Sequence, residues 1–247
     1  AEAFRLPQTA QLKKLAGNWV NAYNSKNGRL SKSTYYEGGG WNYSFRLLHD
    51  MAGRIALYGN EKTFAEDLDR FFGFDELPGW KTGPGNLEGP EKTRFEGLNN
   101  EPDMETPYAY IYAGRHDRTA EVVRNVMAYQ YATGRGGLPG NDDSGGLSSW
   151  YVWNAVGLFP VAGQDVFLVG SPIFDRAELD LADGTLCVVA RNNSAENMYV
   201  GAASFNGKPL HSAHLCWEQI QHGGILILEM TKRPSGWASG IRPPSFH

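Results

Sequence analysis

The sequence predicts an α+β fold, in which a helical region that forms part of an α/α toroid is followed by a small antiparallel β domain. Apolar residues recur at helical spacing through the first two thirds of the chain, and long loops join the helix pairs, as in a toroid. After Ala162, short strand-like runs are separated by turn signals. We therefore divide the 247 residues into a helical region at 1–162, a β domain at 163–235 and an irregular tail at 236–247.

Helical spacing predicts helices over about 12–23, 41–58 and 64–72, the last two ended by Gly59 and Gly73. A Gly- and Pro-rich loop follows from about 77 to 90, and 106–112 begins a further helical run. We expect Asp117 or Thr119 to cap the next helix, and Ser148 or Ser149 to cap one over 150–158 that ends by Pro160. That last helix is apolar almost all round, which predicts burial.

Strand signals occupy 166–169, 177–181, 186–190, 198–204 and 225–229, with hairpin turns at Asp183-Gly184 and Asn206-Gly207. The two cysteines, Cys187 and Cys216, both fall in strand-like segments. Two cysteines predict no disulfide framework. We expect two buried free thiols, with a single bridge as the alternative if the strands are neighbours.

Composition excludes several classes of partner. The formal net charge of −4 favours neither nucleic acid nor an anionic membrane surface, and no apolar run is long enough to span a bilayer. The chain does not begin with Met and carries no signal peptide, which suggests a processed or truncated piece. Aromatic residues make up 13% and include seven Trp, which either fill the core or form stacking platforms for sugars.

Three loops concentrate oxygen-bearing side chains at 36–43, 99–105 and 140–145. Each precedes a segment with a helical signal, and loops held on a rigid scaffold are where binding and catalytic groups collect. Few basic residues accompany them. This composition suits a polyol substrate, a hard cation, or both.

Glu37 in the first loop precedes three glycines, which let the backbone approach a ligand closely. Neighbouring aromatic residues would desolvate its carboxyl, raise the pKa and suit a general acid. The alternative is a carboxylate at a helix N-terminus that interacts favourably with the helix dipole. In the third loop, Asp142 and Asp143 offer an ionised base for activating water, or a turn with a helix cap.

Asn100 and Glu101 offer an amide oxygen and a carboxylate to a hard cation such as Ca²⁺, although their spacing does not match an EF-hand. The alternative is a turn that hydrogen-bonds itself. The six histidines show no metal-ligand spacing, and His49-Asp50 is expected inside a helix as a packed pair. The sequence has no nucleophile elbow, phosphate loop or dinucleotide fingerprint.

Taken in order, these motifs resemble glycoside hydrolase family 92 over nearly the whole chain. The residues that carry the resemblance are Glu37-Gly38 with Trp41-Asn42-Tyr43, Asn100-Glu101-Pro102 with Pro107-Tyr108 and Tyr112-Ala113-Gly114, Gly140–Gly145 with Ser148–Val152 and Gly157–Pro160, Gly170–Phe174, and Asn206–Leu210. The family comprises inverting, calcium-dependent exo-α-mannosidases that pair an N-terminal β-sandwich with an (α/α)6 barrel.

The resemblance implies a site and a substrate. It makes Glu37 the general acid and Asp143 the general base, with Asp142 or Asn141 assisting, and Asn100 and Glu101 calcium ligands. It places Trp41, Asn42, Glu96 and Asn141 at a mannose-containing glycan. It also implies a secreted or periplasmic enzyme.

The chain departs from the family pattern in two ways. Glu96-Gly97 stands where many members have His-Glu, Asn42 where many have Gln, and Asn141 where many have Asp. The sandwich and the first barrel helices are absent, so another chain or another part of a longer protein would supply them. Two alternatives stay open: a non-catalytic sugar-binding or remnant fragment, and a helical-barrel glycosidase for another sugar.

Overall fold

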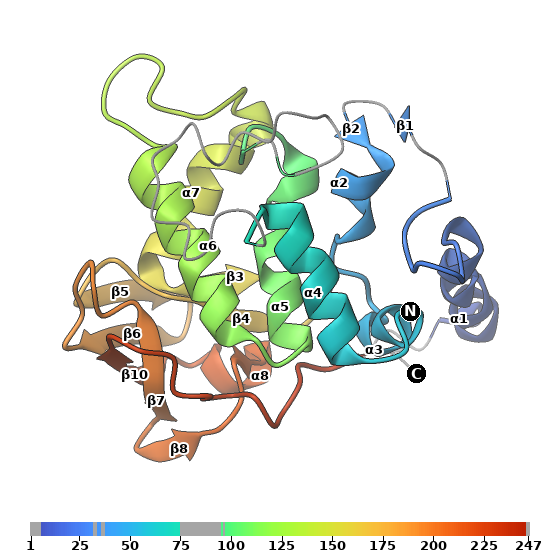
Figure 1. Cartoon of the computed structure of the whole chain (residues 1–247). Coiled ribbons are helices and arrows are strands. Elements are labelled where there is room, and N and C mark those ends of the chain that lie inside the picture. The colour runs from blue at the N-terminus through green and yellow to red at the C-terminus, as the bar shows by residue number, and fades with distance from the viewer. Residues whose placement is uncertain (1–5, 32–33, 36–37, 75–94, 96, 246–247) are drawn as a thin grey trace.

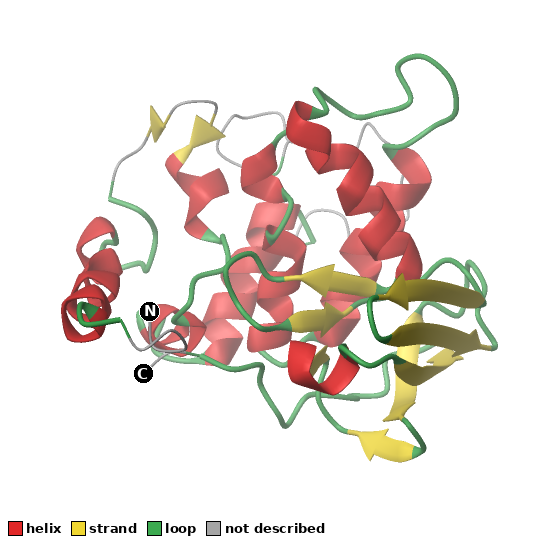
Figure 2. Ribbon diagram, turned by 180° about the vertical axis from the view of Figure 1, so that it is seen from behind, coloured by secondary structure: helices red, strands yellow, loops and turns green. Residues whose placement is uncertain are grey.

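The computed structural model describes residues 6–31, 34–35, 38–74, 95 and 97–245. The helices pack side by side, and the strands after α7 (Gly146–Val156) gather at one end of them, whereas the short hairpin of β1 (Thr34–Tyr35) and β2 (Gly38–Gly39) lies at the other end beside α2 (Gly40–Ser44) (Figures 1 and 2). The predicted mixture of a helical region and a β region is confirmed. In the part of the chain that is described, no helix has the length and apolar character needed to cross a membrane.

The helical elements are short at the N-terminus and longer in the centre. They are α1 (Thr9–Ala16), η1 (Gly17–Ala22), α2 (Gly40–Ser44), α3 (Met51–Ala56), α4 (Glu61–Phe72), η3 (Glu101–Asp103), η4 (Thr106–Tyr108), α5 (Ala109–Tyr112), α6 (His116–Tyr129), η5 (Asp143–Gly145), α7 (Gly146–Val156) and α8 (Trp217–Ile220). Helix α4 matches its prediction closely, since Gly73 ends it with a left-handed φ of 80°.

The single helix predicted over 41–58 is wrong, because the chain forms α2 and α3 with a break between them. Phe45 ends α2 at φ −108° and ψ 12°. Asp50 then begins α3 as its N-cap, and its Oδ1 accepts a hydrogen bond from the Gly53 amide at 2.9 Å. A carboxylate that caps a helix cannot lie inside one, so the expected helical setting of Asp50 is also wrong.

The starts of α6 and α7 and the end of α7 differ from the predicted positions. Helix α6 begins at His116, which leaves Asp117 in its first turn, where the carboxylate accepts both hydrogen bonds of the Arg115 guanidinium. Helix α7 begins at Gly146 and ends at Gly157, which has a left-handed φ of 89°. It is buried on one side only, since Val152 is 59% exposed.

Among the residues that the structure describes, the strands form two larger sheets and one short hairpin. The five-stranded sheet has the order β5 (Arg176–Leu181), β6 (Gly184–Arg191), β10 (Gly224–Thr231), β7 (Tyr199–Phe205), β8 (Lys208–Leu210); the three-stranded sheet has the order β3 (Leu158–Pro160), β4 (Phe167–Val169), β9 (His214–Leu215); and β1 (Thr34–Tyr35) pairs with β2 (Gly38–Gly39). Both predicted hairpins form, but the first turns at Ala182-Asp183, one residue before the predicted Asp183-Gly184, because Gly184 already pairs with Leu181. Asn206 and Gly207 have φ values of 49° and 76°, as a type I′ turn requires.

The prediction of a purely antiparallel β domain is wrong at one position. Strand β10 lies between β6 and β7, antiparallel to β7 but parallel to β6. The hydrophobic runs of β6 and β10 fit this central position, because residues such as Leu186, Val188, Leu226 and Leu228 are all buried.

The helical region shares its core with the three-stranded sheet. One cluster of buried side chains joins Phe64, Phe71 and Tyr108 to Val166 and Leu168. The division at residue 162 stays a prediction, but the two regions are in contact across it. Both cysteines are free thiols; Cys187 is buried and Cys216 is half-buried.

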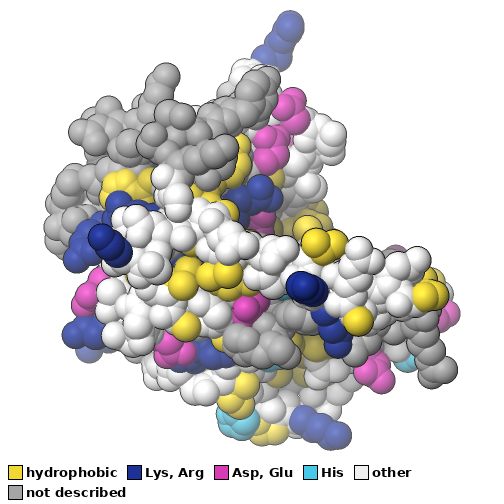
Figure 3. Space-filling model, turned by 90° about the vertical axis from the view of Figure 1, so that its right-hand side faces the viewer, with side chains coloured by type: hydrophobic (Ala, Val, Ile, Leu, Met, Phe, Trp, Pro, Cys, Tyr) yellow, Lys and Arg dark blue, Asp and Glu magenta, His cyan; other side chains and the backbone are white. Residues whose placement is uncertain are grey.

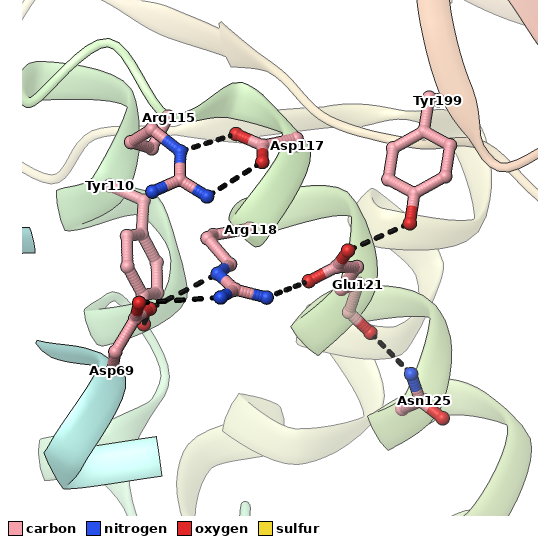
Figure 4. Close-up of polar contacts among 8 residues, drawn as sticks. All are labelled: Asp69, Tyr110, Arg115, Asp117, Arg118, Glu121, Asn125 and Tyr199. Atoms are coloured by element: carbon pink, nitrogen blue, oxygen red, sulfur yellow. Dashed lines mark hydrogen bonds and ion pairs between the residues drawn. The ribbon is translucent and has the colours of Figure 1, made fainter. Parts of the chain in front are cut away.

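Polar contacts join three parts of the fold (Figure 4). The guanidinium of Arg118 on α6 lies 2.7 Å from a carboxylate oxygen of Glu121 and 3.1 Å from one of Asp69 on α4. Glu121 also accepts a hydrogen bond from the Tyr199 hydroxyl on β7 at 2.7 Å, and Asp69 accepts one from Tyr110 at 2.8 Å. These contacts tie α4, α6 and the large sheet together.

The buried His116 predicts a loss of stability in acid. Burial lowers its pKa from 6.5 to about 4, and its Nε2 lies 3.1 Å from the Val169 carbonyl oxygen. Between these pH values the unfolded chain binds a proton that the folded chain does not, so the free energy of unfolding falls as the pH falls below 6.5. From pH 7.5 to 5.0 the contribution of His116 is a loss of about 2 kcal/mol.

Urea unfolding at both pH values measures this effect. In His116→Gln the loss from pH 7.5 to 5.0 should be smaller by about 2 kcal/mol than in the parent. His211→Gln, at an exposed position, is the matched control and should leave the loss unchanged. An equal loss in the parent and in His116→Gln would contradict the expectation.

Candidate functional site

The three oxygen-rich loops of the sequence lead to one end of the helices. Helix α2 and the loop before α7 both lie at the upper end in Figure 1. The segment 99–105 lies between them and contacts both, as the following distances show. Glu37 and Glu96 lie outside the described residues, so the first loop is represented by β2 and α2.

Segment 99–105 is bonded to α2 and the residues after it through two acidic side chains. Asn42 Nδ2 lies 3.4 Å from Asp103 Oδ2. The Glu105 carboxylate accepts hydrogen bonds from the Arg46 guanidinium at 3.0 Å and from the Leu47 amide at 3.2 Å. The sequence placed Asp103 and Glu105 in the acidic loop but assigned them no role. Their position after an Asn-Glu-Pro turn was the only available signal.

The other side of segment 99–105 contacts the third loop so closely that glycine is needed. A Cβ added at Gly140 would lie 2.1 Å from the Asn99 carbonyl oxygen, and one at Gly146 would lie 2.8 Å from the Met104 side chain. The indole nitrogen of Trp150 donates a hydrogen bond to the Met104 carbonyl at 2.7 Å. The backbones around Asn99 and Gly140 are therefore in direct contact.

The two adjacent carboxylates of the third loop have different surroundings. Asp142 accepts hydrogen bonds from the Ser148 amide at 2.9 Å and the Ser148 hydroxyl at 2.7 Å, and these bonds lower its pKa. It therefore anchors the start of α7. Asp143 is exposed and, within the described residues, makes no side-chain hydrogen bond or ion pair.

The backbone after Asp143 turns sharply into α7. Ser144 and Gly145 both adopt positive φ, 54° and 75°. Asn141, just before the acidic pair, is also exposed. The exposed end of this loop thus carries one carboxylate that no other described side chain engages.

Asn100 and Glu101 are half-buried at the start of η3, where Asn100 Oδ1 accepts the Glu101 amide at 2.9 Å. The turn that the sequence left as an alternative is therefore present. The donors suit a hard cation, since they are oxygen atoms only, and an amide oxygen keeps a second lone pair. Among the described residues, no group of three or more His, Cys, Asp or Glu is placed to hold a metal ion. Any complete ligand set would need donors of other kinds or from elsewhere.

Trp41 and Asn42 are engaged by the protein. The Arg29 guanidinium lies over the Trp41 ring at 4.0 Å, and Phe71 meets that ring edge-on at 6.0 Å. Asn42 is 5% exposed, and its Oδ1 lies 3.3 Å from the Gly39 amide. Both side chains hold α2 in place beneath the loops. Arg29 was not foreseen, because its sequence position carries no motif.

Comparison with a family model identifies the family of the chain. The glycosyl hydrolase family 92 catalytic domain matches residues 7–232. The chain belongs to glycosyl hydrolase family 92. The matched range includes all three loops, α2 to α7 and both larger sheets.

A curated glycosidase and two solved members of family 92 are similar to this chain. An uncharacterized secreted glycosidase from Arthroderma benhamiae is 30% identical over 217 residues, which cover 85% of this chain and 26% of that protein. A family GH92 inverting mannosidase from Bacteroides thetaiotaomicron gives a TM-score of 0.78 at 26% identity, covering 96% of this chain and 36% of the other. A family GH92 α-mannosidase from the same species, solved with mannoimidazole, gives 0.73 at 26% identity and covers 93% and 31%.

This member of family 92 thus spans about a quarter of the length of its curated relative and about a third of the length of these solved structures. At the end where the described loops lie, Asn141 and Asp143 expose an amide and a carboxylate. Such a surface can bind hydroxyl groups and accept a proton from water.

Proposed function

We propose that this chain carries the catalytic region of an inverting, calcium-dependent exo-α-mannosidase, which removes terminal α-linked mannose from glycans. The observation that carries the proposal is the family match over residues 7–232 together with the contact between the described loops. The mannosidases among the solved relatives support mannose as the sugar. The secreted glycosidase supports an extracytoplasmic location.

In this proposal one carboxyl group acts as the general acid and a second acts as the general base. Glu37 donates a proton to the leaving glycosidic oxygen, while Asp143 takes a proton from the water that attacks the anomeric carbon from the opposite face. The exposed and unengaged carboxylate of Asp143 suits a base better than Asp142, which Ser148 holds. Inversion requires the two carboxyl groups to lie about 6.5–9.5 Å apart, which leaves room for the water.

The remaining polar groups bind and orient the sugar. Asn141 is exposed beside the proposed base. Glu96 would contact the terminal mannose. Trp41 and Asn42 would support the site from beneath the loops. Asn100 and Glu101 would hold a calcium ion, which supplies positive charge to polarise sugar hydroxyls when bound. Asp142 positions the loop by anchoring it to α7.

An assay with an aryl α-mannoside and a mannobiose in the presence of calcium tests the proposal. The chain is expected to release mannose with inverted anomeric configuration, detected by NMR of the initial product. EDTA should abolish release, and added calcium should restore it. Activity that persists in EDTA would refute the calcium role, and product of retained configuration would refute the mechanism.

The length of the chain favours a second candidate, a non-catalytic sugar-binding or remnant fragment. Calcium-dependent mannose binding without turnover would support it. The Glu96-Gly97 sequence likewise motivates a helical-barrel glycosidase for another sugar, which a panel of aryl glycosides tests. Hydrolysis of a different glycoside at a higher kcat/KM than the mannoside would favour that alternative.

We further propose that these helices form part of an (α/α)6 barrel, completed together with a β-sandwich by further polypeptide. Helix α1 and η1 bury none of their residues, and Leu12, Leu15 and Val20 are 41–54% exposed. Apolar side chains are visible on this face (Figure 3). Exposed apolar patches of this kind mark interaction surfaces. In the same assay, faster release of mannose when barrel and sandwich segments are added would support completion, and an unchanged rate would contradict it.

A further inference from the structure

A cavity of about 320 Å³ lies between α6, α7 and the loops that lead into the large sheet. Its lining includes Arg124 and Tyr129 from α6, Tyr151 from α7, and Ile173 and Met198 from the loops. None of its lining residues belongs to the loops at 99–105 or 140–145. It is therefore separate from the candidate glycosidase site.

Arg124 lines this cavity, and its guanidinium is held in place by neutral groups. Its Nε donates to the Ser171 hydroxyl at 2.9 Å, and its Nη2 donates to the Asn193 side-chain oxygen. Ser171 in turn donates to the Met198 carbonyl at 2.6 Å. These bonds orient the guanidinium plane without neutralising its charge.

No carboxylate of the described residues pairs with Arg124. Burial alone lowers its pKa to about 10, so the group stays charged at neutral pH. Arg29, Arg115 and Arg118, which are also partly buried, are each paired with aspartate or glutamate, whereas the fully buried Arg54 is bonded to the Ser44 carbonyl. A mostly buried charge without a counter-ion is unfavourable, and a bound anion would relieve that cost.

We infer that this cavity binds an oxyanion, the carboxylate or phosphate group of a small molecule such as a sugar acid or sugar phosphate. Arg124 supplies charge and a planar set of donors that matches such groups. Tyr129 and Tyr151 supply aromatic surface for the rest of the ligand, as sugar and other ring compounds require. The volume lies within the range of small-molecule sites.

Calorimetric titration of the chain at constant ionic strength tests this site, with inorganic phosphate, glucuronate and neutral methyl α-glucoside as probes. Phosphate, glucuronate or both should bind, and the neutral sugar should bind at least tenfold more weakly. Arg124→Gln should weaken oxyanion binding about tenfold or more, because it removes a charge-assisted hydrogen bond. Preference for phosphate or glucuronate identifies which oxyanion the cavity selects.

Two further variants keep the test decisive. Ala195→Trp should block the cavity from an exposed position while keeping Arg124, and it should also abolish binding. Arg233→Gln removes one positive charge from an exposed site outside the cavity lining, and it should bind like the parent. Absence of oxyanion binding by the parent, or unchanged affinity in both Arg124→Gln and Ala195→Trp, would overturn the inference.

Discussion

Asp143→Asn is expected to lower kcat for α-mannoside hydrolysis by roughly 10³, because an amide cannot accept the proton of the attacking water. Asp143 is exposed and makes no side-chain hydrogen bond within the described residues, so the substitution should leave Tm and KM nearly unchanged. Initial rates over a range of mannoside concentrations measure kcat and KM separately. They should be recorded in whichever form of the protein is active.

Asp142→Asn is the matched control, because it changes the neighbouring residue by the same chemistry. Its carboxylate holds Ser148 at the start of α7, so the amide should disturb loop position and lower kcat by only about tenfold. Ser148→Ala should reproduce that smaller effect. A loss of kcat in Asp142→Asn that equals or exceeds that of Asp143→Asn would contradict the assignment of the base.

Arg118→Ala is expected to lower the free energy of unfolding by about 3 kcal/mol, the lower end of the range for breaking a buried ion pair. The side chain of Arg118 is 21% exposed, and those of Asp69 and Glu121 are 20% and 12% exposed. Removing the guanidinium leaves two largely buried carboxylates with only tyrosine hydroxyls as partners. Urea unfolding followed by far-UV circular dichroism measures the change.

An exposed ion pair provides the comparison. Arg191→Ala removes a partner of Glu229, with side chains 57% and 41% exposed, and it should cost less than about 1 kcal/mol. Arg118→Met separates packing from charge, because the methionine retains much of the contact with Phe74 that the guanidinium makes at 4.0 Å. Equal and small losses in Arg118→Ala and Arg191→Ala would show that the network contributes little.

The fold was predictable wherever local sequence decides the structure. Gly73 ends α4 and Asn206-Gly207 forms its hairpin, because the left-handed conformation is available to those residues at low cost. The break between α2 and α3 was missed because Leu47 and Leu48 keep the apolar spacing of a helix while Asp50 caps a new one. Periodicity alone does not separate one long helix from two short ones.

The sequence predicts which loops form the candidate site, but it predicts only some of the contacts between them. The acidic composition of 99–105 and 140–145 identified two segments that do touch. The sequence did not show which of the paired aspartates engages the scaffold, because the bonds of Asp142 to Ser148 depend on the geometry of the turn between them. The contact of Arg29 with Trp41 and the parallel pairing of β10 with β6 depend on long-range packing.

The place of β10 in the large sheet also has a consequence for how the chain is made. Strands β5 and β6 leave the ribosome as one hairpin and β7 and β8 as another, but the strand that joins them is synthesised last. Until residues 224–231 emerge, the inner edges of β6 and β7 carry unpaired backbone groups, which are templates for association with other chains. The five-stranded sheet can therefore close only after residues 224–231 have been synthesised.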